Sequence, residues 1–453
     1  MQFELTKEYI DGLKTAIATT DEALSLFLLD DLHAVDIAEI YNELELEEAK
    51  YLFLIIEKEL AADVLSELEE DERERLLKSI PSHIIASQFI DEMDSDDAAD
   101  VLGLLPEDKK EEILQHISDV EQAGDIVDLL NYDEDTAGGL MAKELVKANE
   151  NWNVTTCIKN IKKQAEEVDE LYNVYVVDDD GILKGTLSLK KLIVAYGNEK
   201  VSNIYKADTI SVKAETSSED VANIMDKYDL VSLPVVDSIG RLVGRITIDD
   251  VVDVIREEAE KDYQMMSGIT EDVESGDKTW LLIRSRLPWL LVGLGGSLLG
   301  AWVISGYEDE LGAFPQLAFF APLIAATGGN AGVQSAAIIV QGLASNTMGF
   351  ESTGKKLLKE LIVALFNGLI LSSIVILVTY VFLHSPQLTL TVSLALFSVI
   401  LFATVFGAFV PLILNSFKID PALATGPFIT TSNDILGLFV YFMIGRIIFN
   451  MLL

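Results

Sequence analysis

Long apolar stretches fill the chain from residue 287 to its end. No charged residue occurs at 287–307, 311–350 or 361–417. A membrane-spanning helix needs about 20 apolar residues, so the first two stretches predict one span each, the second with room for an irregular or re-entrant portion. The third is broken at His384-Ser-Pro386 and predicts two spans. Residues 421–452 predict a fifth, with Asp420 as N-cap and Pro421 as first helical residue.

The N-terminal part of the chain, up to about Asp135, has leucines at helical spacing and no strand signature. A short motif recurs as Ala61-Ala-Asp-Val-Leu65 and Ala98-Ala-Asp-Val-Leu102, with looser copies beginning at His33 and Ala123. Short helices with one apolar face must stack on their neighbours. The pattern therefore predicts an all-α superhelical domain over residues 1–138.

From about residue 140, short strand-like runs alternate with helical ones. Residues 173–185 (NVYVVDDDGILKG) align without a gap with residues 232–244 (SLPVVDSIGRLVG). Each copy predicts a strand, an acidic turn closed by glycine, a second strand and a helix. We therefore expect two α/β modules, at 139–200 and 201–256. Cys157, the single cysteine, is expected to be an inert core thiol.

An acidic helix is predicted from about Val251 to Met266. It begins at the end of the second module and continues into a connecting segment (257–283), which leads to a membrane domain (284–453). Spacings of three and four residues place several of its carboxylates on one face, where they repel one another unless cations intervene.

Charge divides the chain as sharply as hydropathy does. The net charge is −41, from 74 acidic and 33 basic residues, and the segment from Leu281 to Leu453 carries seven of each. The whole excess therefore lies before Leu281. So acidic a surface repels nucleic-acid phosphates and attracts cations, which argues against a nucleic-acid partner. The N-terminus lacks the pattern of a cleaved signal, so the acidic half is expected in the cytoplasm.

Basic residues predict how the spans are oriented. Those near the spans lie before the first span or in alternate loops, which places the N-terminus inside and the C-terminus outside. They are Arg284, Arg286, Lys355, Lys356, Lys359 and Lys418. Arg446 lies on the opposite side and is expected to snorkel to the interface.

Asp434 is the one ionisable residue between Pro421 and Gly445. A charge at membrane depth costs about 2.5–3.5 kcal/mol on insertion scales, so such residues usually line an ion pathway. Thr430, Thr431 and Asn433 precede it and offer oxygen atoms, which hard cations prefer. The alternative is a structural carboxyl that is hydrogen-bonded to these same neighbours.

A second polar feature, Ala326-Thr-Gly-Gly-Asn-Ala-Gly-Val-Gln-Ser335, lies in the second span. Its glycines allow close approach of another backbone, and Asn330 and Gln334 lie one turn apart on one face. Alone, the motif fits a packing seam with satisfied amides equally well. Together with Asp434 it favours a pore wall.

The duplicated modules resemble a pair of CBS domains, which often sense ligands. A Thr-x-x-Asp element that binds adenine nucleotides in other CBS pairs is matched by Thr247-Ile-Asp-Asp250 but not by Ser188-Leu-Lys-Lys191. The resemblance therefore leaves ATP open as a second ligand of the pair.

Taken in order, the elements are similar to the MgtE family of magnesium transporters and channels. Three motifs carry the resemblance: Tyr132-Asp-Glu-Asp-Thr-Ala-Gly-Gly-Leu-Met141, Thr327-Gly-Gly-Asn-Ala-Gly-Val-Gln-Ser-Ala336, and Asp420-Pro-Ala-Leu ahead of the span that contains Asp434. The resemblance implies a homodimer with a pore on its axis, closed when cytosolic Mg²⁺ bridges the acidic domains.

The resemblance also implies site residues. Asp434 matches the pore carboxylate. The regulatory Mg²⁺ ligands fall on ten acidic positions: Asp63, Asp96, Asp100, Glu219, Asp226, Asp229, Asp250, Asp253, Glu258 and Asp262. Two positions depart from the family pattern. Lys261 replaces an acidic ligand, and Val333 replaces an asparagine.

The sequence thus predicts a homodimeric Mg²⁺ channel of a bacterial-type inner (cell) membrane, gated by internal Mg²⁺, with no enzymatic activity. It lacks the Gly-x-x-x-x-Gly-Lys loop of an ATPase motor. The alternatives are a Co²⁺ or Mn²⁺ transporter of similar build and a membrane-anchored CBS protein that senses nucleotide.

Overall fold

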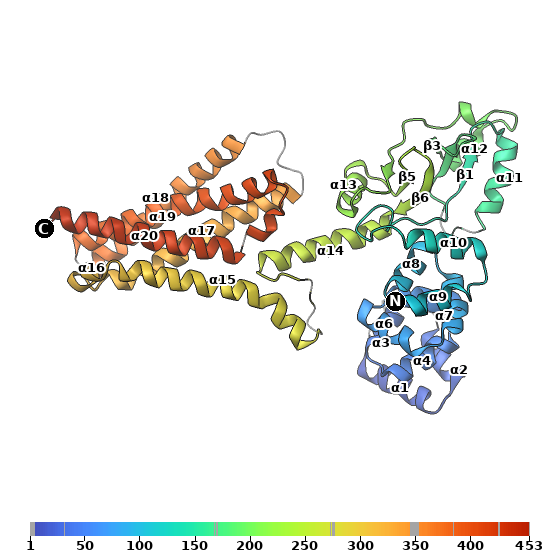
Figure 1. Ribbon diagram of the computed structural model, residues 1–453, viewed down its shortest axis with the longest axis horizontal. Helices are drawn as coiled ribbons and strands as arrows, with labels where there is room; N and C mark the ends of the chain where they lie inside the picture. Colours follow the sequence, from blue (N-terminus) through green and yellow to red (C-terminus); the bar gives the residue numbers. More distant parts are fainter. Residues whose placement is uncertain are drawn as a thin grey trace. The chain divides into compact units, whose positions relative to one another are not determined.

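The computed structural model describes residues 5–30, 32–166, 168, 171–271, 273, 277–344, 353–383, 385–424 and 426–452. They form two compact units, Met1–Arg256 and Glu257–Leu453. The first holds a helical domain followed by two small α/β modules, and the second is all-helical (Figure 1).

The predicted superhelix is confirmed as a stack of short helices. They are α1 (Lys7–Ala18), α2 (Glu22–Leu29), α3 (Ala34–Asn42), α4 (Leu46–Ile55), α5 (Lys58–Ser66), α6 (Glu70–Ser79), α7 (Ser82–Gln88), the 3₁₀ turn η1 (Ile90–Glu92), α8 (Ser95–Gly103), α9 (Glu107–Leu114) and α10 (Val120–Leu129). The recurring motif explains their packing, because Ala61 in α5 and Ala98 in α8 are both fully buried. The aspartates of the same motif, Asp63 and Asp100, face solvent. One repeated pattern therefore builds the core and the acidic surface together.

The duplication predicted from the sequence is confirmed strand for strand. The first module contains β1 (Lys147–Asn149), α11 (Val154–Gln164), β2 (Val174–Val177), β3 (Leu183–Leu187), α12 (Leu189–Val194) and η2 (Val201–Asn203). The second contains β4 (Val212–Lys213), α13 (Ser218–Tyr228), β5 (Ser232–Val236), β6 (Leu242–Thr247) and α14 (Ile248–Met266), which continues into the second unit. In both sheets the middle strand pairs parallel with the first and antiparallel with the third. Cys157 is buried in α11, as predicted, and burial raises the pKa of its thiol to about 11.

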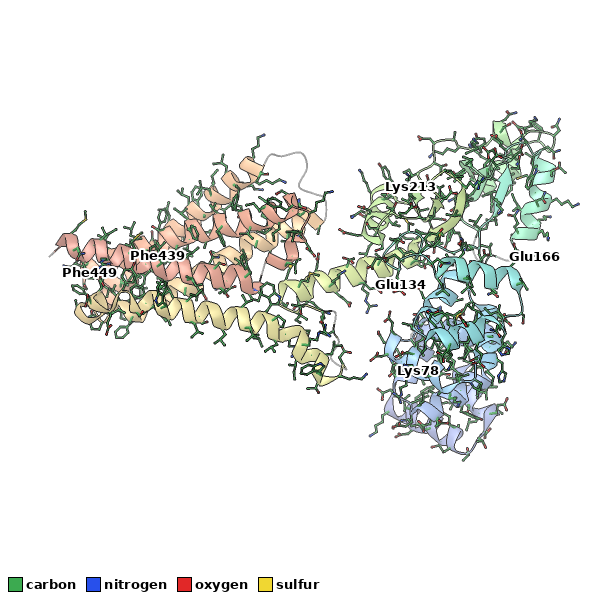
Figure 2. All side chains as sticks on the ribbon, viewed as in Figure 1. Lys78, Glu134, Glu166, Lys213, Phe439 and Phe449 are labelled. Atoms are coloured by element: carbon green, nitrogen blue, oxygen red, sulfur yellow. The ribbon has the colours of Figure 1, made fainter. Side chains whose placement is uncertain are left out.

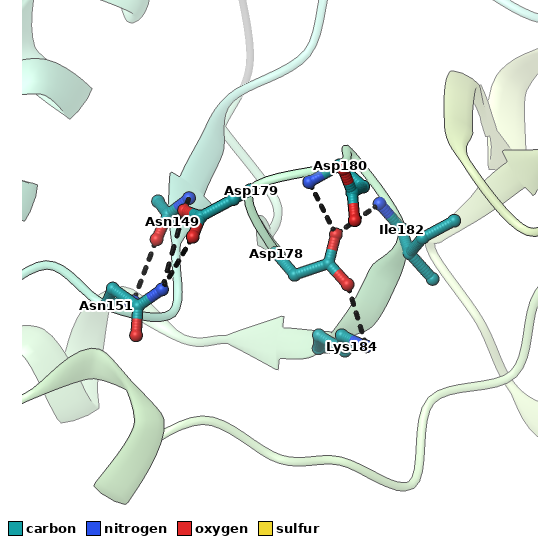
Figure 3. Close-up of polar contacts among 7 residues, drawn as sticks. All are labelled: Asn149, Asn151, Asp178, Asp179, Asp180, Ile182 and Lys184. Carbon is teal, nitrogen blue, oxygen red and sulfur yellow. Dashed lines mark hydrogen bonds and ion pairs between the residues drawn. The ribbon is translucent and has the colours of Figure 1, made fainter.

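The acidic turns of the two modules are built alike. Asp178 accepts hydrogen bonds from the backbone N–H groups of Asp180 and Ile182, at 3.0 and 2.9 Å, and pairs with Lys184 at 2.9 Å (Figure 3). Its hydrogen bond with Lys184 lowers the pKa of Asp178. Asp237 accepts from Ile239 and Arg241 in the same way. These carboxylates therefore fold a turn.

Five long apolar helices form the second unit, and each has the length and composition of a membrane span. They are α15 (Thr279–Ser305), α17 (Leu317–Ala344), α18 (Thr353–Leu383), α19 (Pro386–Ser416) and α20 (Gly426–Leu452). A short helix, α16 (Glu308–Ala313), follows the first span, and a 3₁₀ turn, η3 (Pro421–Ala424), precedes the last. Figure 2 shows side chains such as Phe439 on these helices, and Phe439 is 45% exposed, as suits a lipid-facing surface.

Three details of the predicted spans change. The first helix begins at Thr279, before Arg284 and Arg286, because both arginines continue its helical backbone. The second span is one unbroken helix over its described residues, and 345–350 lie outside them. Asp420 caps η3 rather than α20, accepting from the Ala422 N–H at 2.8 Å.

Glycines set how closely these helices pack. α17 lies against α19 and α20, and α20 also lies against α15. A Cβ at Gly407 of α19 would come within 2.2 Å of the Gly332 carbonyl oxygen of α17. A Cβ at Gly296 of α15 would come within 1.8 Å of Thr431 Cγ2 of α20. Both seams therefore require glycine.

Gly407→Ala should destabilise the membrane unit by about 1–3 kcal/mol, because the added methyl group would meet backbone atoms that cannot move aside. Gly293→Ala is the matched control, since no atom lies within 4 Å of a Cβ at that position of α15. Unfolding of the purified protein in detergent measures both variants. Equal stability of the two variants would contradict the requirement for glycine at position 407.

Candidate cation sites

Acidic side chains from three elements converge in the first unit. Asp96, Asp97 and Asp100 of α8 lie close enough to Asp250 or Asp249, at the start of α14, for their charges to interact. Glu67, at the end of α5, interacts likewise with Asp63 and Asp253. Of the ten predicted regulatory residues, the structure thus gathers five in this acidic cluster: Asp63, Asp96, Asp100, Asp250 and Asp253.

The tightest group in the acidic cluster consists of Asp94, Asp96 and Glu144. One carboxylate oxygen from each lies within 4.8 Å of the others, a spacing suited to a metal ion. Glu144 is held by Ser95, whose hydroxyl and N–H donate to it at 2.7 and 3.3 Å. Carboxylate oxygens are the ligands that Mg²⁺ and Ca²⁺ prefer.

Crowding penalises the charged form of these carboxyls. Burial raises the pKa of Asp100 to about 7, and the charges of Asp97, Glu134 and Asp250 contribute to the shift. Burial also raises the pKa of Asp250 to about 6, although the Thr247 hydroxyl donates a hydrogen bond to it at 2.8 Å. Asp97 and Asp100 still reach solvent. A cation can therefore approach the acidic cluster and relieve its repulsion.

The motif that runs from Tyr132 to Met141 fastens this part of the chain to the second α/β module. Ala137 and Gly138 donate backbone hydrogen bonds to Thr216 and Ala214, at 2.7 and 2.9 Å. A Cβ at Gly138 would lie within 2.3 Å of the Tyr132 ring, so only glycine fits beneath the ring. The motif thus positions Glu134 and Glu144 beside α8.

Sequence reasoning missed Glu67, Asp94, Asp97 and Glu144 as members of the acidic cluster. Asp97 follows a predicted ligand directly, so its neighbour was the available signal. Glu67 lies one helical turn after Asp63, and Asp94 lies two residues before Asp96, so both also had a local signal. Glu144 is brought in by tertiary packing, which spacing along the chain does not reveal.

The remaining predicted regulatory residues lie elsewhere. Glu219 and Asp226 are exposed on α13, and Asp229 ends that helix in the left-handed conformation. Glu258 and Asp262 lie in the part of α14 that belongs to the second unit, where Lys261 pairs with Glu258 at 3.3 Å.

Within the second unit, the end of α14 is joined closely to two spans. A Cβ at Gly426, the first residue of α20, would lie 2.2 Å from the Met266 carbonyl oxygen. Gly268 has a positive φ of 82°, and a Cβ there would lie 2.6 Å from Pro427 Cγ. On α15, Arg284 pairs with Glu271 at 2.9 Å. This docking joint connects α14 to the first turn of the span that carries Asp434.

Asp434 lies on α20 and is half-buried against α17. A Cβ at Gly329 would lie 3.4 Å from its Oδ1 atom. Among the described residues Asp434 has no hydrogen-bond or ion-pair partner. Thr430 instead donates to the Gly426 carbonyl oxygen of its own helix at 3.0 Å. The carboxylate is therefore available to a cation.

The other predicted pore residues are partly packed between helices and partly exposed on α17. Asn433 is 1% exposed and packs on Gly332, where neither atom of its amide group has a partner within the described parts of the chain. Thr431 packs on α15. Asn330 and Gln334 are exposed on one stripe of α17. Amides at membrane depth must face water or protein rather than lipid. Their stripe is thus unsuited to a lipid contact.

Models of known protein families match most of the chain. A model of the "Divalent cation transporter" family matches residues 321–444, one of the "MgtE intracellular N domain" matches residues 32–135, and CBS domain models match residues 137–198 and 201–257.

Curated proteins agree with these models. The chain is 33% identical to the magnesium transporter MgtE of Bacillus subtilis over 92% of each chain. It is also 33% identical to the magnesium transporter MgtE of Thermus thermophilus, over 96% of this chain and 98% of that one.

Two solved structures resemble the acidic part. The soluble part of a magnesium transporter aligns with a TM-score of 0.50 and 31% identity, over 56% of this chain and 99% of that one. The cytosolic domain of the Mg²⁺ channel MgtE in complex with ATP aligns with a TM-score of 0.51 and 34% identity, over 54% and 99%.

Resistance of the first unit to proteolysis should depend on pH when divalent cations are absent. The raised pKa values of Asp100 and Asp250 mean that stability is present at low pH and lost as pH rises through about 6 to 7, because the carboxyls ionise while crowded. Cleavage of the full chain within residues 20–265 should speed up at least about twofold from pH 5 to pH 8.

Mg²⁺ should slow this cleavage more at pH 8 than at pH 5, and K⁺ at equal ionic strength should not. Joint Asp100→Asn and Asp250→Asn substitution should flatten the pH dependence, whereas Asp11→Asn, at an exposed position of α1, should not. Equal protection by both salts would mean that screening, and not bound cations, relieves the repulsion.

Proposed function

Because the chain belongs to the MgtE family of magnesium transporters, we propose that it is a Mg²⁺-selective channel that closes when internal Mg²⁺ binds its acidic unit. It is a multi-pass membrane protein, with the N-terminus inside the cell membrane and the C-terminus outside in the proposed orientation, and Mg²⁺ would flow inward down its electrochemical gradient. At about 100 mV, moving two charges inward releases about 4.6 kcal/mol, so uptake needs no ATPase motor.

The observation that carries this proposal is the unpartnered carboxylate of Asp434 among the described residues of the membrane unit. A carboxylate kept at membrane depth without a protein partner is costly, and a permeating cation would offset that cost. Mg²⁺ dehydrates reluctantly, so Asp434 would bind it largely through retained waters. Gly329 lies opposite and adds no side chain beside the carboxylate, since a Cβ there would lie 3.4 Å from Asp434 Oδ1.

Homodimer formation would explain the exposed amides of α17. In one chain Asn330 and Gln334 lie on the surface of a helix that is long and apolar enough to span a membrane. A second copy facing this stripe would enclose the amides around a shared water-filled axis. The same arrangement would bring two Asp434 carboxylates to one path.

Gating by Mg²⁺ follows from the acidic cluster. A cation bound among the α8 and α14 carboxylates favours the arrangement that brings them together, and only a difference in affinity between two states shifts the equilibrium. The docking joint at Gly268 and Gly426 would pass a movement of α14 to α20. ATP is a candidate second ligand at Thr247 and Asp250, since a related cytosolic domain has been solved with ATP.

Asp434→Ala should abolish Mg²⁺ flux into liposomes while the protein still folds, because the permeating ion loses its only charged ligand on α20 in this part of the span. Asp434→Asn keeps the shape, so its loss of flux would assign the effect to charge. Asp309→Asn, on the exposed short helix α16, is the control. Undiminished flux in Asp434→Ala would refute the role. Parallel assays with Mn²⁺ and Co²⁺ test selectivity, which oxygen ligands alone do not set.

Neutralising the predicted ligands on α14 should leave the channel open. A variant with Asp250, Asp253, Glu258 and Asp262 changed to Asn or Gln should conduct at internal Mg²⁺ levels that close the wild type, because the bridging ions lose their ligands. Lys261→Glu should steepen inhibition, since it replaces the cation now paired with Glu258. Patch recordings with stepped internal Mg²⁺ measure both. An unchanged inhibition curve in the neutralised variant would exclude this helix from the gate.

A further inference from the structure

The membrane unit contains a second buried carboxylate, Glu360, in the third span. It belongs to α18 and is 8% exposed, although Lys355, Lys356 and Lys359 precede it on the same helix. Within the described residues, none of these lysines forms an ion pair with it. A carboxylate buried in a membrane span is costly and usually functional, and the residue that it pairs with indicates its role.

The partner of Glu360 is a hydroxyl on the second span. Ser335 Oγ donates to Glu360 Oε2 at 2.6 Å, and Ser335 is only 2% exposed. Hydrogen bonds to a carboxylate are among the strong ones in proteins, especially when water is excluded. This contact therefore ties α18 firmly to one point of α17.

That point lies on the buried side of α17, which also carries two glycines that meet α20. Gly329 faces Asp434, and Gly332, three residues on, faces Asn433. Ser335 follows after another three residues and, like both glycines, is buried. Asn330 and Gln334 occupy the exposed stripe instead. Glu360 thus contacts the buried side of α17, one to two turns beyond the residue that faces Asp434.

We propose that Glu360 is a positioning residue for permeation, which acts through Ser335 to hold α17 in register against α20. The proposal rests on the proposed channel function. A slip or rotation of α17 would move Gly329 and Gly332 away from Asp434 and Asn433 and change the space in which the ion binds. Glu360 does not bind the ion itself, because its carboxylate is buried and already accepts the Ser335 hydroxyl.

The test measures the Mg²⁺ concentration for half-maximal flux of the full chain in liposomes, alongside the maximal flux. Ser335→Ala and Glu360→Ala should each raise the half-saturating concentration about tenfold, the scale of a lost hydrogen bond to a charged group. The double variant should be no worse than either single one, because both remove the same contact. Glu360→Gln keeps an acceptor oxygen and should stay within about threefold of the wild type.

Ser373→Ala on α18 is the matched control, since among the described residues the Ser373 hydroxyl donates only to the Leu369 carbonyl oxygen of its own helix. Ala variants that match this control, or single effects that add in the double variant, would overturn the proposal. So would Glu360→Gln behaving like Glu360→Ala, which would identify the charge itself as essential.

Two further arms separate this proposal from the channel function. If the wild type conducts no Mg²⁺, or if Asp434→Ala conducts as well as the wild type, the channel function is refuted but the Ser335–Glu360 contact is not. The thermal unfolding midpoints of the wild type, the two Ala variants and the double variant then still test the contact. The changes in midpoint should show the same non-additivity. Additive midpoints would overturn the Ser335–Glu360 coupling regardless of transport.

Discussion

Repulsion between carboxylates is the constraint on which the first unit depends. The net charge of −41 is confined to the acidic part of the chain, and folding brings α8 and the start of α14 together, where burial already raises the pKa values of Asp100 and Asp250. The apolar cores of the superhelix and the two sheets supply the stability that opposes this repulsion. A unit built in this way is expected to respond to cations, because every bound cation would remove part of the repulsion.

The membrane unit meets a different constraint, which is to keep polar atoms at membrane depth without opening gaps. Glycine seams solve it. Gly296, Gly332 and Gly407 let backbones and short polar side chains approach where larger residues would hold the helices apart. Arg446, which sequence reasoning left to snorkel, pairs instead with Glu310 at 2.7 Å and lies over the Tyr307 ring. The charge at that helix end is therefore neutralised within the protein.

Local patterns in the sequence predicted much of the fold. The duplicated modules, the helical superhelix and the five spans all follow from periodicity and turn residues, and each is present. The predicted start of α15 was wrong because hydropathy shows only where the uncharged stretch begins. The helix itself already includes Arg284 and Arg286.

The sites were less accessible to sequence reasoning. Asp434 stood out as the one charge in its span, and the α8 aspartates were carried over from a resemblance. Glu144 and Glu360 were not found, because each becomes a site residue only through contact with a distant segment, with Ser95 and Ser335 respectively. Such contacts depend on tertiary packing.

In the proposed gating, cation binding to the acidic cluster and closure of the pore are one equilibrium. Hydrogen exchange of the backbone amides of α8 and α14 tests it directly, measured on the full chain while Mg²⁺ is raised at constant ionic strength. Both helices should become protected over the same range of Mg²⁺ concentration in which flux falls. Loss of flux with no change in the protection of either helix would contradict it.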